Sequence, residues 1–153
     1  MIKKYKFLTN ILFILLMGCG FNSVLKNTSF NFSIEKIDVI GDNNINNNIL
    51  AGLENYRNNS EEKKYYLKIS STQEKIVTSK DTKGNPKTWT IEIKTIVETS
   101  NINKLIEKKE FNEKTSYNTM SSKFDLSLYE NIIKTNLAEK IARDISFYLN
   151  SLN

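Results

Sequence analysis

The sequence lacks histidine altogether and has a single cysteine, Cys19, among its 153 residues. Without histidine, the chain cannot build the Ser–His or Cys–His pairs that activate many enzyme nucleophiles. The usual zinc ligand sets, which combine His and Cys side chains, are disfavoured for the same reason. One cysteine also excludes a disulfide within the chain, so the fold must be held by its core. We therefore expect a protein that is not an enzyme and that holds no cofactor or metal.

Excess charge of one sign is also small once the N-terminal segment is set aside. The chain has 22 Lys and Arg residues and 17 Asp and Glu residues, and without Lys3, Lys4 and Lys6 the basic count falls to 19. Nucleic-acid-binding domains carry a concentrated basic excess, so nucleic acid is not expected as a partner. The acidic residues are scattered over the chain, and no pair is obviously placed for general acid–base work.

The first eighteen residues have the composition of an export signal. Three lysines precede an apolar run over residues 7–17, which is broken only by Thr9 and Asn10. A helix of eleven residues is about 16 Å long, roughly half of a hydrocarbon core about 30 Å thick. A basic start, a short apolar stretch and small residues at its end are typical of a signal peptide rather than a membrane span.

The residues Leu16-Met17-Gly18-Cys19 resemble the lipobox of bacterial lipoproteins. The resemblance implies cleavage before Cys19 and covalent acylation of that residue, which anchors the chain because several acyl chains bind a membrane firmly. Residues 1–18 are then the signal peptide and residues 19–29 the acylated cysteine and a tether. The residue after the cysteine is Gly20. An aspartate at this position would resemble an inner-membrane retention signal, so Gly20 favours the outer membrane. An ordinary secretory signal with a chance cysteine is the alternative.

Alternating apolar residues predict four strands in the exported part. Residues 30–39 alternate with a one-residue shift, which indicates a bulge at Glu35-Lys36. Residues 65–79, 88–100 and 105–118 predict three further strands that follow one another as antiparallel neighbours. The tract 81–86, which contains the only proline, is typical of a hairpin loop. The charged residues 108–110 favour an edge position for the last strand.

Two amphipathic helices complete the pattern. The first is predicted over residues 45–57, and the second begins near residue 126, with Asp125 or Ser127 as its N-cap and Ser127 and Glu130 as a capping box. Apolar positions of the second helix recur at three- and four-residue steps: Leu126, Tyr129, Ile133, Leu137, Ile141, Ile145, Tyr148 and Leu152. We therefore expect a single α+β domain over residues 30–153, a two-layer sandwich with two helices packed on one face of a mainly antiparallel four-stranded sheet.

Several motifs, in this order behind the lipobox, resemble the LPS-assembly lipoprotein family, LptE. Cys19-Gly20-Phe21 is similar to the start of that family after its acylated cysteine. Residues 115–118, followed by Ser122 and Phe124, look like its last strand running into its last helix. Residues 137–141 look like the Leu-Ala-x-x-Ile core of that helix. The chain departs from the family at residues 22–25, where family members often have a Pro-Leu-Tyr-like run.

The resemblance implies a role in the outer membrane. Such lipoproteins plug and help to assemble the barrel of the outer-membrane protein LptD, and they assist lipopolysaccharide transport and insertion at the cell surface. The implied partners are an LptD-like barrel, lipopolysaccharide and, through the lipid anchor, the outer membrane. The implied location is the periplasmic side of that membrane and the barrel lumen.

Four lysines are the candidates for contact with lipopolysaccharide, because the family carries basic residues in the same hairpin and before the same helix. They are Lys80, Lys83, Lys87 and Lys123. Ammonium groups are good partners for phosphate groups such as those of lipid A. Lysines that merely keep the surface soluble are the alternative interpretation.

Two other functional hypotheses fit less of the sequence. An auxiliary lipoprotein of a lipid-trafficking ABC transport system, tethered at the periplasmic face, would share the lipobox and the small α+β domain. The identity of the binding partner distinguishes it from the LptD-related role. A periplasmic hydrolase is disfavoured, because the chain has no histidine and its one thiol is expected to be lipidated.

Overall fold

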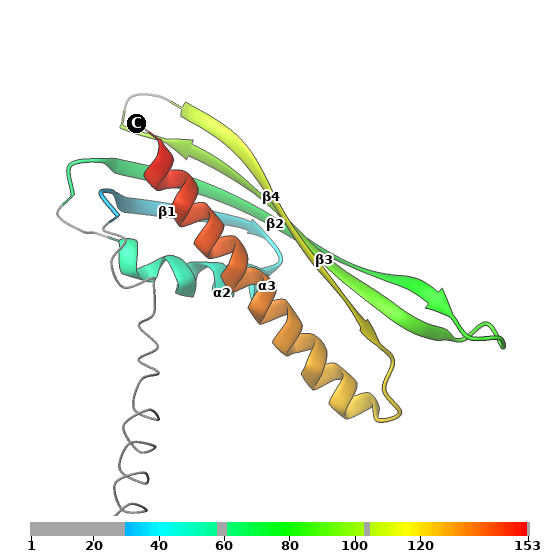
Figure 1. Ribbon diagram of the computed structural model, residues 1–153. Coiled ribbons are helices and arrows are strands. Elements are labelled where there is room, and N and C mark those ends of the chain that lie inside the picture. The colour runs from blue at the N-terminus through cyan, green and yellow to red at the C-terminus, as the bar shows by residue number, and fades with distance from the viewer. Residues whose placement is uncertain (1–29, 58–60, 103–104, 153) are drawn as a thin grey trace, which may run out of the picture.

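The computed structural model describes residues 30–57, 61–102 and 105–152 (Figure 1). The expected signal peptide, residues 1–18, and the expected acylated Cys19 with its tether, residues 19–29, lie outside the described residues.

Four strands form one sheet in the order β1-β2-β3-β4. They are β1 (Ser33–Gly41), β2 (Lys64–Lys80), β3 (Pro86–Ser100) and β4 (Leu105–Asn118). The short β1 pairs with β2 in parallel, whereas β2 with β3 and β3 with β4 are antiparallel. The register of β1 shifts between Ile34 and Lys36, which confirms the predicted bulge. β4 lies at an edge, as its charged residues predict.

The helices α2 (Asn43–Leu53) and α3 (Lys123–Ser151) lie on the same face of the sheet (Figure 1). A short 3-10 helix, η2 (Glu54–Tyr56), continues α2. The predicted two-layer α+β architecture, with a mainly antiparallel four-stranded sheet, is therefore confirmed. Because α2 has 11 residues and α3 has 29, the N-terminal half of α3 continues beyond the part of the sheet that α2 covers.

The core lies between the helices and the sheet. β3 shows the alternation most clearly, because every second residue from Ile91 to Thr99 is buried. The main apolar residues of the core are Phe32, Ile34, Ile45, Ile49, Leu53, Leu67, Ile69, Ile91, Ile93, Val97, Ile133, Leu137, Ile141, Ile145 and Leu149. Burial of an isoleucine or leucine side chain contributes about 1.5–3 kcal/mol, so this cluster accounts for a fold without disulfides.

The junction between β1 and α2 determines where β1 ends. Gly41 has a φ of +96°, and the amide of Asp42 donates to the carbonyl of Ser71 at 3.0 Å. The Asp42 carboxylate then accepts hydrogen bonds from the amides of Asn44 and Ile45, both at 3.0 Å. Asp42 is thus the N-cap of α2, and the chain leaves the sheet beside Ser71.

Two expectations about helix ends are wrong. The first helix runs over residues 43–53, not 45–57, because Asp42 caps it and residues 54–56 tighten into η2. The N-cap of α3 is Ser122, whose hydroxyl oxygen accepts from the amide of Asp125 at 3.2 Å. Ser127 therefore lies within α3 and cannot form the predicted capping box.

Candidate ligand-binding end of the sheet

The β2–β3 hairpin ends in a tight turn over residues 81–85. The Asp81 carboxylate accepts hydrogen bonds from the amides of Lys83 and Asn85, both at 2.8 Å. The side chain and backbone of Asn85 lower the pKa of Asp81, because they donate to its charged form. Gly84 adopts a φ of +86°, as glycine does readily in such turns. The turn therefore has a defined conformation that presents Lys83 at its tip.

The hairpin lysines lie where the sequence predicts. Lys80 pairs with Pro86 across the base of the turn, and Lys87 follows Pro86 on β3. All three hairpin lysines and Lys123 are exposed. Within the described part of the chain, none of the four forms an ion pair with a carboxylate. Their charges are thus open to an anionic ligand.

Thr119 connects the start of α3 to the hairpin. Its amide donates to the carbonyl of Lys87 at 2.9 Å, and its hydroxyl donates to the carbonyl of Pro86 at 3.0 Å. The indole nitrogen of Trp89 donates to the same hydroxyl oxygen at 2.9 Å. Lys123 is the first residue of α3, four residues after Thr119, so it shares this end of the molecule with the hairpin lysines (Figure 1).

An exposed apolar stripe follows Lys123 on α3. Phe124, Leu128 and Ile132 are 78%, 53% and 50% exposed, and their four-residue spacing places them on one side of the helix. We call these three side chains the α3 stripe. The stripe was not among the sequence-based expectations, because the buried positions of the same helix form a more regular pattern. The signal that was present is the i, i+4 and i+8 recurrence of large apolar residues outside the core positions.

A polar network holds α3 against the hairpin. The Glu130 carboxylate lies 2.6 Å from the Lys75 ammonium and accepts from the Tyr117 hydroxyl at 2.7 Å. The Lys75 ammonium also lies 4.3 Å from the centre of the Trp89 ring. These contacts join β2, β3, β4 and α3 beyond the apolar core.

The pKa values of the network follow from its geometry. Burial alone raises the pKa of Glu130, but the hydrogen bonds from Lys75 and Tyr117 outweigh burial, and the net effect is a lowered pKa. Burial and the adjacent Glu130 carboxylate raise the pKa of Tyr117 well above its ordinary value. Glu130 is therefore charged and Tyr117 neutral at pH 7.

The sheet face away from the helices is polar. The Glu98 carboxylate lies 3.2 Å from the Lys108 ammonium and 3.6 Å from that of Lys68. On the same face the side-chain amide of Asn112 donates to Glu92 at 2.7 Å. Cross-strand pairs of this kind make a hydrated face that need not be covered by further protein.

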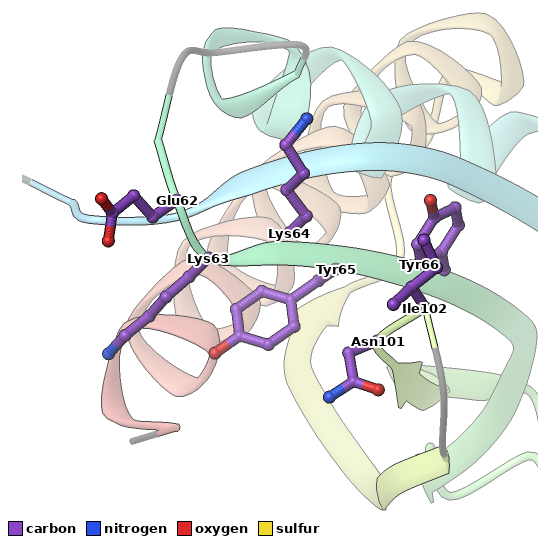
Figure 2. A pocket seen from close by; sticks show the side chains of 7 residues that line it. All are labelled: Glu62, Lys63, Lys64, Tyr65, Tyr66, Asn101 and Ile102. Atoms are coloured by element: carbon purple, nitrogen blue, oxygen red, sulfur yellow. The ribbon is translucent and has the colours of Figure 1, made fainter.

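A pocket of about 390 Å³ lies at the end of the sheet where β2 begins (Figure 2), opposite the hairpin (Figure 1). Its lining residues are Glu62, Lys63, Lys64, Tyr65, Tyr66, Asn101 and Ile102. The Lys64 ammonium is held by Glu35 at 2.9 Å, and the Tyr65 hydroxyl donates to the carbonyl of Leu152 at 3.0 Å. None of the candidate lysines lines this pocket, so it is separate from the hairpin end.

No described helix combines the length and hydropathy of a membrane-crossing segment. No three His, Cys, Asp or Glu side chains in the described ranges gather closely enough to hold a metal ion.

No family model matches the sequence, and no curated protein matches it in sequence. Solved structures do match in fold. Rare lipoprotein B from Shewanella oneidensis superposes with a TM-score of 0.54 at 10% identity, over 74% of this chain and 96% of that one. The fold is that of small bacterial lipoproteins.

Two more structures support this lipoprotein fold. A minor lipoprotein from Acinetobacter baumannii gives a TM-score of 0.60 at 9% identity, over 80% of this chain and 92% of that chain. Lipoprotein B from Nitrosomonas europaea gives a TM-score of 0.52 at 9% identity, over 78% and 84% of the two chains. These proteins are similar in architecture, and their identities are too low to transfer the role of any residue.

Proposed function

We propose that the chain is a non-enzymatic outer-membrane lipoprotein, acylated at Cys19, which plugs and assembles an LptD-like barrel and assists lipopolysaccharide transport. The lipoprotein fold, the lipobox and the resemblance to the LptE family support this proposal together.

The observation that carries the proposal is the combination of charge and apolar surface at the hairpin end. Exposed lysines of the hairpin lie toward the same end of the molecule as Lys123, which the exposed α3 stripe follows directly on the helix, and Thr119 bonds this segment to the hairpin. Lipid A presents phosphates beside acyl chains, so one amphiphile matches both kinds of side chain. Lysines that only solubilise the surface do not call for three large exposed apolar side chains directly after Lys123 on α3.

The polar sheet face supports the barrel part of the proposal. The lumen of a large outer-membrane barrel is wet and polar. A domain whose open sheet face carries paired lysines and carboxylates can lie in such a lumen without a desolvation penalty for unpaired charge. A compact domain with one core is also small enough to act as a plug.

A non-enzymatic role accords with the chemistry of the side chains. The best-buried carboxylate network, around Glu130, already bonds to Lys75 and Tyr117 and joins four elements. It joins the hairpin strands to α3, and Glu130 does not line the pocket where β2 begins. We therefore assign it a positioning role.

Charge reversal tests the ligand part of the proposal. The variant combining K83E, K87E and K123E should bind purified lipopolysaccharide about tenfold more weakly at low salt, because three exposed cations are lost. The variant K63E, at the opposite end of the sheet, is the matched control and should bind like the parent protein. Equal binding by the triple variant would contradict the assignment of this end as the ligand site.

The partner decides between the proposed role and the ABC-transport alternative. The LptD-related role requires an outer-membrane barrel in the isolated complex. Subunits of an inner-membrane transporter in its place would favour the auxiliary-lipoprotein role.

A further inference from the structure

The outer edge of β2 is paired with β1 over the first half of its length only. β1 pairs with β2 from Ser33 opposite Lys64 to Gly41 opposite Ser71, and there the pairing stops. β2 continues to Lys80, paired only with β3 on its other side (Figure 1). Among the described residues, no strand pairs with the outer side of β2 after Ser71. We call residues 72–77 the open β2 edge.

The open β2 edge starts where the close approach of Gly41 to Ser71 ends β1. A Cβ atom at residue 41 would lie 2.1 Å from the carbonyl oxygen of Ser71, so only glycine allows the close approach that ends β1. Asp42 then starts α2 and also accepts a hydrogen bond from the side chain of Gln73 at 2.8 Å. The edge ends at a bulge in the register between Val77 and Ser79.

Few of the usual protective devices are present on the open β2 edge. Native proteins protect edge strands with lysines, prolines, bulges or covering elements. β4, the other edge, has charged residues at 107–110 and 113–114. The open β2 edge has two charged residues, Glu74 and Lys75, and Lys75 is already bound to Glu130. Ile76 is 45% exposed beside them.

We propose that the open β2 edge docks an extended segment of a partner polypeptide, which adds a strand to the sheet. A row of free backbone amides and carbonyls is matched fully only by another extended backbone. On the polar face, the added strand would place a basic residue opposite Glu74 and an apolar residue opposite Ile76. This surface lies on β2, apart from the lysines and the α3 stripe, and the inference stands whichever protein is the partner.

The chain's own tether does not fit this edge. The structure begins at Phe30, close to the start of β1, and residue 72 lies eight residues beyond Lys64, about 27 Å along β2. The ten residues between Cys19 and Phe30 span at most about 35 Å when fully extended. After crossing β1, no more than two or three of them would remain to pair.

A second copy of the chain does not fit either. A two-fold antiparallel pairing in one continuous sheet must centre on a residue that faces itself. The two registers with the greatest overlap centre on Glu74 or on Lys75, and either one places like charges directly opposite each other, which is destabilising. A register centred on Ile76 runs into the bulge after Val77. The edge therefore disfavours self-pairing and leaves a different protein as the occupant.

Site-specific photocrosslinking in the native envelope tests the inference. A photoreactive amino acid replaces Glu74 or Ile76 in the full-length lipoprotein, with the same replacement at Glu110 on the β4 edge as the control. A β-ladder predicts that positions 74 and 76 crosslink to one partner segment at sites two residues apart, with no such crosslink from position 110. Crosslinks only to a second copy of this chain, to scattered sites, or to nothing would overturn the proposal.

A substitution provides a second measurement. I76K should lower the partner recovered in a mild-detergent pull-down about tenfold, because a lysine replaces the apolar cross-strand contact. I102K, which changes a side chain that is 80% exposed in the β3–β4 turn, should leave recovery unchanged. Equal recovery with I76K contradicts the docking edge. Lipopolysaccharide binding by I76K should equal that of the parent, which separates this inference from the proposed ligand site.

Discussion

At the scale of single residues, two glycines with positive φ have different roles. Gly41 has its hydrogen atom facing the carbonyl of Ser71, whereas Gly84 has open space around the position of a Cβ atom. Gly41 therefore meets a steric and a conformational requirement, and Gly84 meets only the conformational one. The sequence marks both as turn positions and cannot separate them, because the contact of Gly41 is with a residue thirty positions away.

The first prediction compares these glycines. G41A should lower the free energy of unfolding by about 3 kcal/mol or more, because strain and a backbone clash add. G84A should cost only about 1–2 kcal/mol. Urea unfolding of the unlipidated chain, followed by circular dichroism, measures both. A G41A variant as stable as G84A would contradict the close approach of β1 to β2.

The second residue-scale prediction concerns Glu130 and pH. Its pKa is lowered in the folded state, so its stabilising effect is present above its unfolded pKa, about 4.3, and is lost as pH falls through the lowered folded value. E130Q should therefore be about 1 kcal/mol less stable than the parent at pH 7 and closer to it at pH 3. Unfolding by urea at both pH values measures the difference.

The matched control for this prediction is E139Q, at an exposed position of the same helix. It should change stability little at either pH. A gap between E130Q and the parent that is as large at pH 3 as at pH 7 would mean that the lost stability does not come from the charge. The sequence did not predict this network, since Lys75 and Glu130 are 55 residues apart and the local pattern placed Glu130 in a capping box with Ser127.

At the scale of elements, α3 shows what periodicity can and cannot predict. The existence of the helix and its core positions Ile133, Leu137, Ile141, Ile145 and Tyr148 follow from the three- and four-residue spacing. Tyr129 was expected among them but is 40% exposed, and the fully buried Leu149 was not expected. Its start does not, because the contacts of Thr119 with Pro86 and Lys87 place the end of β4 and let the helix begin at Lys123. Two apolar stripes on one helix have similar spacing, and only the tertiary structure shows which of them is covered.

The start of α3 gives an element-scale prediction. S122A removes the side chain that accepts from the amide of Asp125, and it should cost about 1 kcal/mol of unfolding free energy. S127A, which tests the capping box expected from the sequence, should cost less than about 0.5 kcal/mol. Thermal unfolding of the two variants beside the parent measures this. The opposite order would place the helix start about five residues later.

The buried and the exposed apolar stripes of α3 give a second element-scale prediction. L137A, at a buried position, should destabilise the domain by about 2–5 kcal/mol. L128A, in the exposed α3 stripe, should change stability by less than about 0.5 kcal/mol but weaken binding of lipopolysaccharide. Denaturant titration and a binding assay separate the two effects. Loss of stability in L128A with unchanged binding would show that the stripe serves the fold.

At the scale of the whole molecule, the sequence predicted the layers, the four strands and the exposed hairpin lysines, because each depends on local patterns. The sequence did not predict that these lysines share one end of the molecule with the α3 stripe, nor did it predict the open β2 edge. The first depends on Thr119 joining two distant segments, and the second on where β1 stops relative to β2. Both features lie toward the hairpin side, away from the start of β1 (Figure 1).

We propose above all that this protein works with an outer-membrane barrel. The most direct test is a mild-detergent pull-down of the tagged full-length lipoprotein from its native envelope, with mass spectrometry of the proteins recovered. The account predicts one barrel protein of outer-membrane size in equimolar amount. Recovery of inner-membrane transporter subunits alone, or of no protein in stoichiometric amount, would contradict it.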